Sequence, residues 1–356
     1  MLRRSLLLHG VFTAVILLPG PAGNPPAEAQ QATTSEASKL PPPVEVHKED
    51  PARLTTVDGV RLAATYLPGP KSEENGKETV PVILLHDHKG SGKDFGQLAA
   101  YLQSQGHAVL VPDLRGHGES TEKLGARAPL DAATMPRLGF VRMVDADMEV
   151  LKNFLLKENN EEKVNIEKLC IVGAGMGASV AVNWARLDWI RPPIGNVKQG
   201  QDVKGLVLLS PESSTPGLPI SAPMRAQPLT VVLADRQLQR ALKDGVGLQL
   251  GMPVSLDFRR EVSVMIVVGG RNSRAVSEAK RLHTMFERFH PDPPPGEKTP
   301  EKDLFYGTLD TKLQGTKLLG AKLNLEKHIA QFIQLRLENR AIPWSKRVKD
   351  PYARPK

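Results

Sequence analysis

The residues with the clearest chemical potential lie in two short segments. The first, Gly173-Ala-Gly-Met-Gly177, is a glycine-rich turn that follows an apolar run and opens a helical pattern. Backbone N–H groups at such a helix start can bind an anion such as a carboxylate or a phosphate. The second, His86-Asp87-His88, follows another apolar run. Two imidazoles one residue apart in an extended segment point to one side, which suits a first-row divalent metal ion.

The glycine-rich turn also fits the dinucleotide-binding fingerprint Gly-x-Gly-x-x-Ala, read from Gly173 to Ala178. That motif needs an acidic residue about 20 residues further on to bind the ribose. The apolar run after it spans 203–209, and Glu212 lies well beyond the expected spacing. We therefore predict no cofactor and no metal, and keep His86 and His88 as the residues to inspect for a metal.

Apolar runs of strand length alternate with amphipathic helical patterns along most of the chain. The apolar runs span 80–86, 108–112, 169–172, 203–209, 262–268 and 304–309. The helical patterns span 95–105, 144–155, 178–187, 275–289 and 325–333. Strands without polar alternation are buried on both faces, so the fold class is α/β, with a mainly parallel sheet and helices on both faces. Asp58-Gly59, between 53–57 and 60–67, predicts an additional hairpin.

Three segments together resemble the α/β-hydrolase superfamily, in its serine aminopeptidase and esterase-like branch. They are Leu84-Leu-His86, the string Asp113-Leu-Arg-Gly-His-Gly-Glu-Ser120 with the Val-Pro that precedes it, and Ile171 to Gly177. The resemblance covers residues 52–339 and implies an α/β-hydrolase fold. It also implies a catalytic triad of serine, acid and histidine carried on loops that follow successive strands.

The elbow of that family reads Gly-x-Ser-x-Gly, and here only its flanks are intact. Gly173 and Gly177 stand at the flanking positions, but Gly175 stands where the nucleophile is expected. The resemblance places the oxyanion hole at the backbone N–H groups of His88 and Met176. The turn is therefore predicted to keep its shape without its nucleophile.

The acid, the base and the rim of the hole also depart from the family. Asn272 stands at the acid position and Gln314 at the histidine position, where an amide cannot act as a general base. His328, the only histidine farther along, belongs to the last helical pattern. Asp87 replaces a small or apolar residue, and its carboxylate opposes a developing anion unless it turns away. The predicted triad is thus degenerate.

The ends of the chain predict export. The 356 residues are 40% hydrophobic and 24% charged, which is ordinary for a globular protein. Arg3 and Arg4 precede an apolar stretch that ends near an Ala-x-Ala cleavage site at Ala29, so 1–29 is predicted to be a signal peptide. The mature protein would have no transmembrane span and would be periplasmic or extracellular. Residues 30–51 are predicted to be a disordered lead segment before the hydrolase-like domain at 52–339.

Two further segments complete the predicted domain organisation. Residues 211–260 are rich in proline and are predicted to form a lid or irregular excursion over the carboxyl edge of the sheet. Residues 340–356 form a basic tail that could contact an anionic envelope surface. Nothing in the sequence has the pattern of a nucleic-acid binder.

These observations favour an exported hydrolase-fold protein that lacks the Ser-His-Asp triad. We expect it to be inactive as a serine hydrolase and to bind a small ligand in the cleft between the sheet edge and 211–260. Two alternatives remain open at this point. One is an active esterase or peptidase-like hydrolase with a displaced or metal-based site near His86 and His88. The other is a cell-envelope interaction protein that acts through its basic tail.

Overall fold

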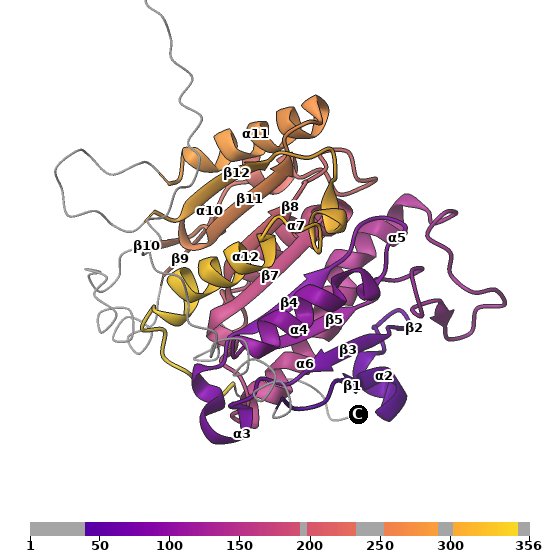
Figure 1. Ribbon diagram of the computed structural model, residues 1–356. Coiled ribbons are helices and arrows are strands. Elements are labelled where there is room, and N and C mark those ends of the chain that lie inside the picture. The colour runs from indigo at the N-terminus through magenta and orange to yellow at the C-terminus, as the bar shows by residue number, and fades with distance from the viewer. Residues whose placement is uncertain (1–39, 193–197, 233–252, 291–301, 348–356) are drawn as a thin grey trace, which may run out of the picture.

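A central sheet with helices on both faces organises the molecule (Figure 1). The computed structural model describes residues 40–192, 198–232, 253–290 and 302–347. The sheet has eight strands in the order β1-β3-β5-β4-β7-β8-β11-β12. Their bounds are β1 Val44–Glu45, β3 Ala64–Leu67, β4 Pro81–Leu85, β5 Ala108–Pro112, β7 Leu169–Ala174, β8 Val203–Leu209, β11 Ser263–Gly269 and β12 Leu304–Leu309. Pairs β1–β3 and β3–β5 are antiparallel and the rest are parallel, which confirms the predicted fold class.

Alternate residues of the buried strands face two separate cores. In β4, Ile83 belongs to the core beneath α6 (Met148–Asn160), α7 (Met176–Trp189) and α11 (Ser273–Glu287). Val82 and Leu84 belong to the core beneath α4 (Gly96–Ser104) and α12 (Leu325–Ile333). Because every β4 residue is buried, the strand reads as one continuous apolar run.

Shorter elements connect the main ones. They are α2 Val46–Glu49, β2 Val60–Arg61, α3 Ser72–Asn75, β6 Glu122–Lys123, α5 Arg137–Arg142, α8 Ser221–Arg225, β9 Leu229–Val232, β10 Pro253–Leu256 and α10 Phe258–Glu261. Within the described ranges, no helix is both long and apolar enough to cross a membrane. The predicted signal peptide, 1–29, lies outside these ranges.

The fold begins earlier than the sequence predicted. From residue 40 the chain is described, and β1 pairs with β3, placing Val44 opposite Tyr66. Val46, at the start of α2, is fully buried. The disordered segment predicted for 30–51 is therefore wrong from residue 40 onward, because β1 pairs with β3 and Val46 is buried, which no local periodicity reveals. The predicted hairpin is reduced to one bridge, Thr55 with Arg61.

The proline-rich excursion packs against the core in the part that the structure describes. Leu218, Ile220 and Met224 are buried in the core shared with α7 and α11. From there the chain reaches the β9–β10 pair and α10, which leads into the start of β11 (Figure 1). Apolar side chains scattered among prolines therefore pack into the helix layer. The stretch 233–252 lies outside the described residues.

The described part of the basic tail, 340–347, packs against the domain, and we call it the C-terminal strap. Asn165 Nδ2 donates to the carbonyl of Ile342 at 3.2 Å, and Asn159 Nδ2 donates to that of Ser345 at 3.0 Å. Arg347 forms ion pairs with two acids of the domain, as discussed below. Two of its basic residues, Arg340 and Arg347, are therefore already paired with acids of the domain.

Candidate functional site

The elbow after β7 has the sharp geometry that the sequence predicted. Gly175 has φ 50° and ψ −112°, between the end of β7 and the start of α7. A Cβ on Gly177 would lie 2.2 Å from the carbonyl oxygen of Leu85, so this position must be glycine for the helix to approach β4. A Cβ on Gly173 would lie 2.5 Å from the carbonyl oxygen of Gly177. The two flanking glycines thus hold a tight strand-to-helix turn with Gly175 at its tip.

The Asp87 carboxylate lies where a nucleophile side chain would start. A Cβ on Gly175 would be 2.0 Å from Asp87 Oδ1 and 2.2 Å from its Cγ. Asp87 comes from the loop that directly follows β4, and this loop packs against the elbow because β4 and β7 are neighbours. The absence of a side chain at 175 is therefore matched by a carboxylate that fills the same space.

The same carboxylate occupies the predicted oxyanion hole. Asp87 Oδ1 accepts hydrogen bonds from the backbone N–H of His88, at 2.7 Å, and from that of Met176, at 3.0 Å. These are the two donors that the resemblance assigned to the hole. The structure brings them together on one oxygen atom, so the donors are in place but satisfied by the chain's own anion.

This arrangement reverses the electrostatics of a hydrolase site. An ester or amide substrate would have to develop its negative charge beside the Asp87 carboxylate, and two like charges a few ångströms apart repel strongly in a partly buried site. The second oxygen, Oδ2, faces the turn at Gly315, where a Cβ would lie 3.0 Å away. The two N–H groups predicted to form the oxyanion hole thus bind an internal carboxylate.

Gln314 is held rigidly at the histidine position. Its Oε1 accepts from the hydroxyl of Ser210 at 2.7 Å, and its Nε2 donates to the carbonyl of Gly269 at 3.0 Å. The Ser210 hydroxyl also accepts from the N–H of Gly315 at 3.0 Å. The amide therefore ties the loop before α12 to the ends of β8 and β11, and it cannot move a proton near neutral pH.

Ser210 is a member of this cluster that the sequence did not single out. It follows β8 and has a left-handed backbone, φ 47°, which is uncommon for a residue other than glycine. Its position at the carboxyl end of a parallel strand was the available signal. With its hydroxyl bonded to Gln314 and Gly315, Ser210 positions the loop before α12.

Asn272 caps a helix at the predicted acid position. Its Oδ1 accepts from the N–H of Ala275 at 3.1 Å, at the N-terminus of α11. Asparagine is among the best residues for that role, since its side chain satisfies a free N–H of the first turn. The Asn272 side chain thus stabilises α11. Gln314, at the histidine position, donates to the carbonyl oxygen of Gly269.

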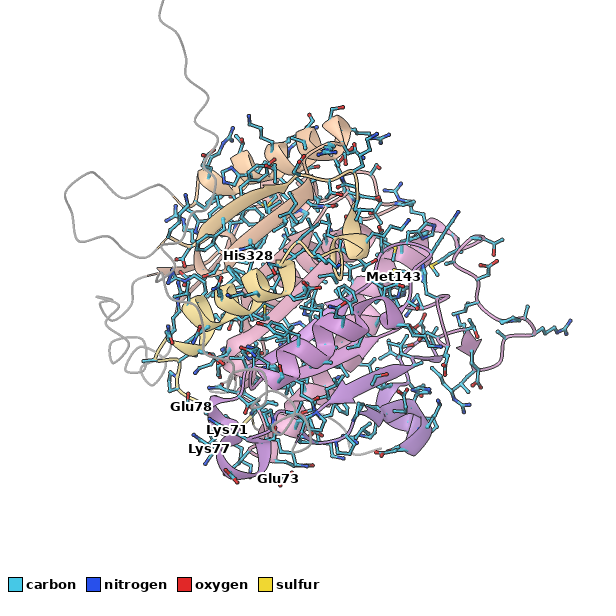
Figure 2. The ribbon with its side chains drawn as sticks, viewed as in Figure 1. Lys71, Glu73, Lys77, Glu78, Met143 and His328 are labelled. Carbon is cyan, nitrogen blue, oxygen red and sulfur yellow. The ribbon has the colours of Figure 1, made fainter. Side chains whose placement is uncertain are left out.

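Of the two histidines kept as metal candidates, His86 is bound to the backbone through both ring nitrogens. His86 is fully buried, its Nδ1 lies 2.8 Å from the Asp87 carbonyl oxygen, and its Nε2 accepts from the N–H of Leu114 at 2.9 Å. Both ring nitrogens are therefore used by the backbone, and burial lowers the pKa of His86. In the described ranges, no three His, Cys, Asp or Glu side chains converge as metal ligands do. His328 lies on α12 (Figure 2).

His117 belongs to the same packed cluster. Its ring lies 4.9 Å from that of His86 and 5.6 Å from that of His88, between ring centroids. Burial and the neighbouring His86 lower the pKa of His117 to about 4, so the ring is neutral at physiological pH. His86 and His117 therefore pack together without adding positive charge beside Asp87.

The loop from Asp113 to Ser120 braces the site. Asp113 accepts from the N–H groups of Gly92 and Glu119, each at 2.7 Å. Arg115 pairs with Asp147 and Asp58, and its hydrogen bond lowers the pKa of Asp58 well below the usual range. Asp113 and Arg115 therefore bind different partners, and the motif fixes the loop that carries His117.

The assignment of the hole predicts chemical rescue. We expect Asp87→Gly to lose about 1 to 3 kcal/mol of folding free energy, because two N–H groups lose a charged acceptor. Acetate at roughly tens of millimolar should restore part of the lost folding free energy, because it can accept from the two N–H groups that Asp87 no longer occupies. Thermal denaturation with acetate or chloride at equal ionic strength measures the effect. The wild type, whose hole is filled, serves as the control, and an equal response to acetate in both proteins would contradict the assignment.

The chain is similar to several solved structures at low identity. An esterase from Pyrococcus furiosus is 16% identical with a TM-score of 0.47, over 85% of this chain and 94% of that chain. A dienelactone hydrolase from Anabaena variabilis is 14% identical with a TM-score of 0.42, over 80% and 95%. The protein TT1662 from Thermus thermophilus is 13% identical with a TM-score of 0.47, over 80% and 98%. No curated protein matches the sequence.

The family model gives the assignment that these distant structures cannot. The model described as alpha/beta hydrolase fold matches residues 80–290, which is more than half of the chain and includes β4, the elbow and β11. On that match, and with the sheet order and elbow described above, the chain belongs to the alpha/beta hydrolase fold family.

Proposed function

We propose that this protein is a hydrolase-fold pseudoenzyme that acts by binding and not by serine-based hydrolysis. The observation that carries the proposal is the Asp87 carboxylate, which accepts both N–H groups of the predicted oxyanion hole and fills the space beside Gly175. A site arranged in this way has neither a nucleophile nor free donors for a developing oxyanion. The motif at 113–120 supports descent from the serine aminopeptidase and esterase-like branch.

The other departures agree with this proposal. Removing the nucleophile of a catalytic triad costs about as much activity as removing all three members, because the triad works as a unit. Selection would then no longer act on the remaining members, which accounts for Asn272 and Gln314 standing at the acid and histidine positions. Both residues have taken structural hydrogen bonds, one as a helix cap and one between loops.

Neither alternative is favoured by a specific contact. A metal-based site at His86 would require breaking the contact of each ring nitrogen with the backbone. An envelope contact through the basic tail would compete with internal pairs, since Arg340 binds Asp303 and Arg347 binds Asp202. Export remains part of the proposal on the strength of the predicted signal peptide alone.

Hydrolysis of short-chain nitrophenyl esters tests the proposal. We expect the purified mature protein, starting at Gln30, to show no turnover above that of a His88→Ala variant. The metal content of chelator-free protein should be measured on the same sample. Robust turnover that disappears in His88→Ala would overturn the proposal and locate a serine-free active site in the loop at 86–88.

A further inference from the structure

A cavity of about 520 Å³ lies away from the elbow, on the side of the sheet covered by α4. Its walls come from α2, β3, β5 and the start of α4, which adjoin one another at the β3 end of the sheet (Figure 1). We call it the edge cavity. It differs from the cleft predicted beside 211–260, since none of its lining residues belongs to that excursion.

The floor of the edge cavity is made of small and apolar side chains. Ala63 and Ala64 of the β3 side, and Ala99 of α4, are almost fully buried, and Val111 of β5 lies beside them. At Gly96 a Cβ would meet no atom within 4 Å, so the cavity is open there. Such a floor can pack against the apolar part of a small ligand, and the volume lies in the usual range for ligand sites.

The rim carries charges of both signs. Three side-chain nitrogens lie near the carboxylate oxygens of Glu119: His47 Nε2 at 3.3 Å, Lys93 Nζ at 3.7 Å and Lys48 Nζ at 4.0 Å. The two lysines are 84% and 62% exposed, so they can turn toward a ligand at little cost. On the other side of His47, Glu45 accepts from the hydroxyl of Thr65 at 2.9 Å.

His47 contacts Glu119 through its Nε2. The N–H of Ala64 donates to His47 Nδ1 at 3.3 Å, which leaves the proton on Nε2, facing Glu119. The hydrogen bond from His47 and the charge of Lys48 lower the pKa of Glu119, so this acid is ionised at neutral pH. Acidic and basic groups therefore line the same cavity.

We propose that the edge cavity binds a small zwitterion of the amino-acid or dipeptide class. Its ammonium group would pair with Glu45 and Glu119, its carboxylate with Lys48 and Lys93, and its side chain would lie on the alanine floor. A simple anion would face the two glutamates, and a simple cation would face the two lysines. This inference goes beyond the proposed function, because it does not depend on whether the elbow is catalytic.

Titration calorimetry of the full mature chain with three related probes tests the class of ligand. They are leucyl-alanine, its Nα-acetyl derivative, which keeps only the carboxylate, and its amide, which keeps only the ammonium. We expect leucyl-alanine to bind and each blocked form to bind at least about tenfold more weakly. Equal affinity for all three probes would overturn the proposal. So would the absence of binding by any of them at about 10 mM.

A matched pair of variants tests the location. Gly96→Phe places a ring in the open part of the cavity, and Gly96→Ala adds only a methyl group at the same helical position. Both should fold, since the backbone there is right-handed helical. We expect the phenylalanine variant to lose binding at least about tenfold with an unchanged melting temperature, and the alanine variant to bind like the wild type. Unchanged binding in Gly96→Phe would show that the probe binds elsewhere.

Discussion

The variant Gly175→Ser, which restores the residue that the family carries at the elbow, should destabilise the protein by about 3 kcal/mol or more and should not create an esterase. The new Cβ would lie 2.0 Å from Asp87 Oδ1, a separation that side chains do not adopt. Either the carboxylate leaves its two N–H donors or the elbow shifts. The left-handed φ of 50° adds backbone strain for any residue with a side chain. Urea denaturation of both proteins measures the loss.

The double variant Asp87→Gly/Gly175→Ser isolates the cause. If the carboxylate is what excludes the serine, the double variant should be more stable than Gly175→Ser by about 2 kcal/mol, although each single change destabilises. Gly96→Ser is the matched control, because a Cβ there meets nothing, and it should be close to neutral. A Gly175→Ser protein as stable as the wild type would show that Asp87 does not fill the elbow. Ester hydrolysis should stay at background even in the double variant, because Gln314 cannot accept the serine proton.

The alternation of strands and helices could be predicted from the sequence because it is a local property. Strands buried on both faces are continuous apolar runs, and β5 and β8 have the predicted bounds, 108–112 and 203–209. The elbow could also be located, because its glycines are required by close backbone approach: the turn itself forces the residue type at Gly173 and Gly177.

The direction of the side chains at the site could not be predicted. The sequence placed Asp87 at the rim of the hole and left open whether its carboxylate turns away; only the fold shows that it turns in. The His-x-His spacing suggested two rings on one side of an extended segment. In the structure the strand ends at Leu85, so His86 turns inward to the N–H of Leu114. Such outcomes depend on contacts between residues far apart in the chain, which no periodicity encodes.

The C-terminal strap was misjudged for the same reason, and its removal is the second variant from which we expect a large effect. Deleting residues 340–356 should cost about 4 kcal/mol of folding free energy. Asp202 is buried, and although burial raises its pKa, the charges of Lys152, Lys198 and Arg347 bring that pKa well below the usual range. The deletion removes Arg347 from this group. Two cations remain beside Asp202: Lys152 Nζ at 2.8 Å from its Oδ2 and Lys198 Nζ at 3.1 Å from its Oδ1. A buried carboxylate that loses a cation is costly.

The strap also satisfies polar groups of the domain, and this part of the loss is separate from charge. Asn159 and Asn165 donate to strap carbonyls, and Lys77 lies 4.8 Å from the ring centroid of Trp344; Lys77 marks this end of the molecule in Figure 2. Deleting only 348–356 is the matched control. It removes Lys349, Arg354 and Lys356 but none of these contacts, and should leave the urea midpoint unchanged.

The two deletions separate a structural role of the strap from an envelope-binding role of the tail. If the tail acts only by its charge, both deletions should weaken binding to anionic vesicles and neither should lower stability. If the strap acts as described, stability falls only when 340–347 is removed, and Arg347→Met alone should reproduce about half of the loss. Equal stability of the two truncated proteins would contradict the strap's role, because every contact on which it rests lies between Arg340 and Arg347.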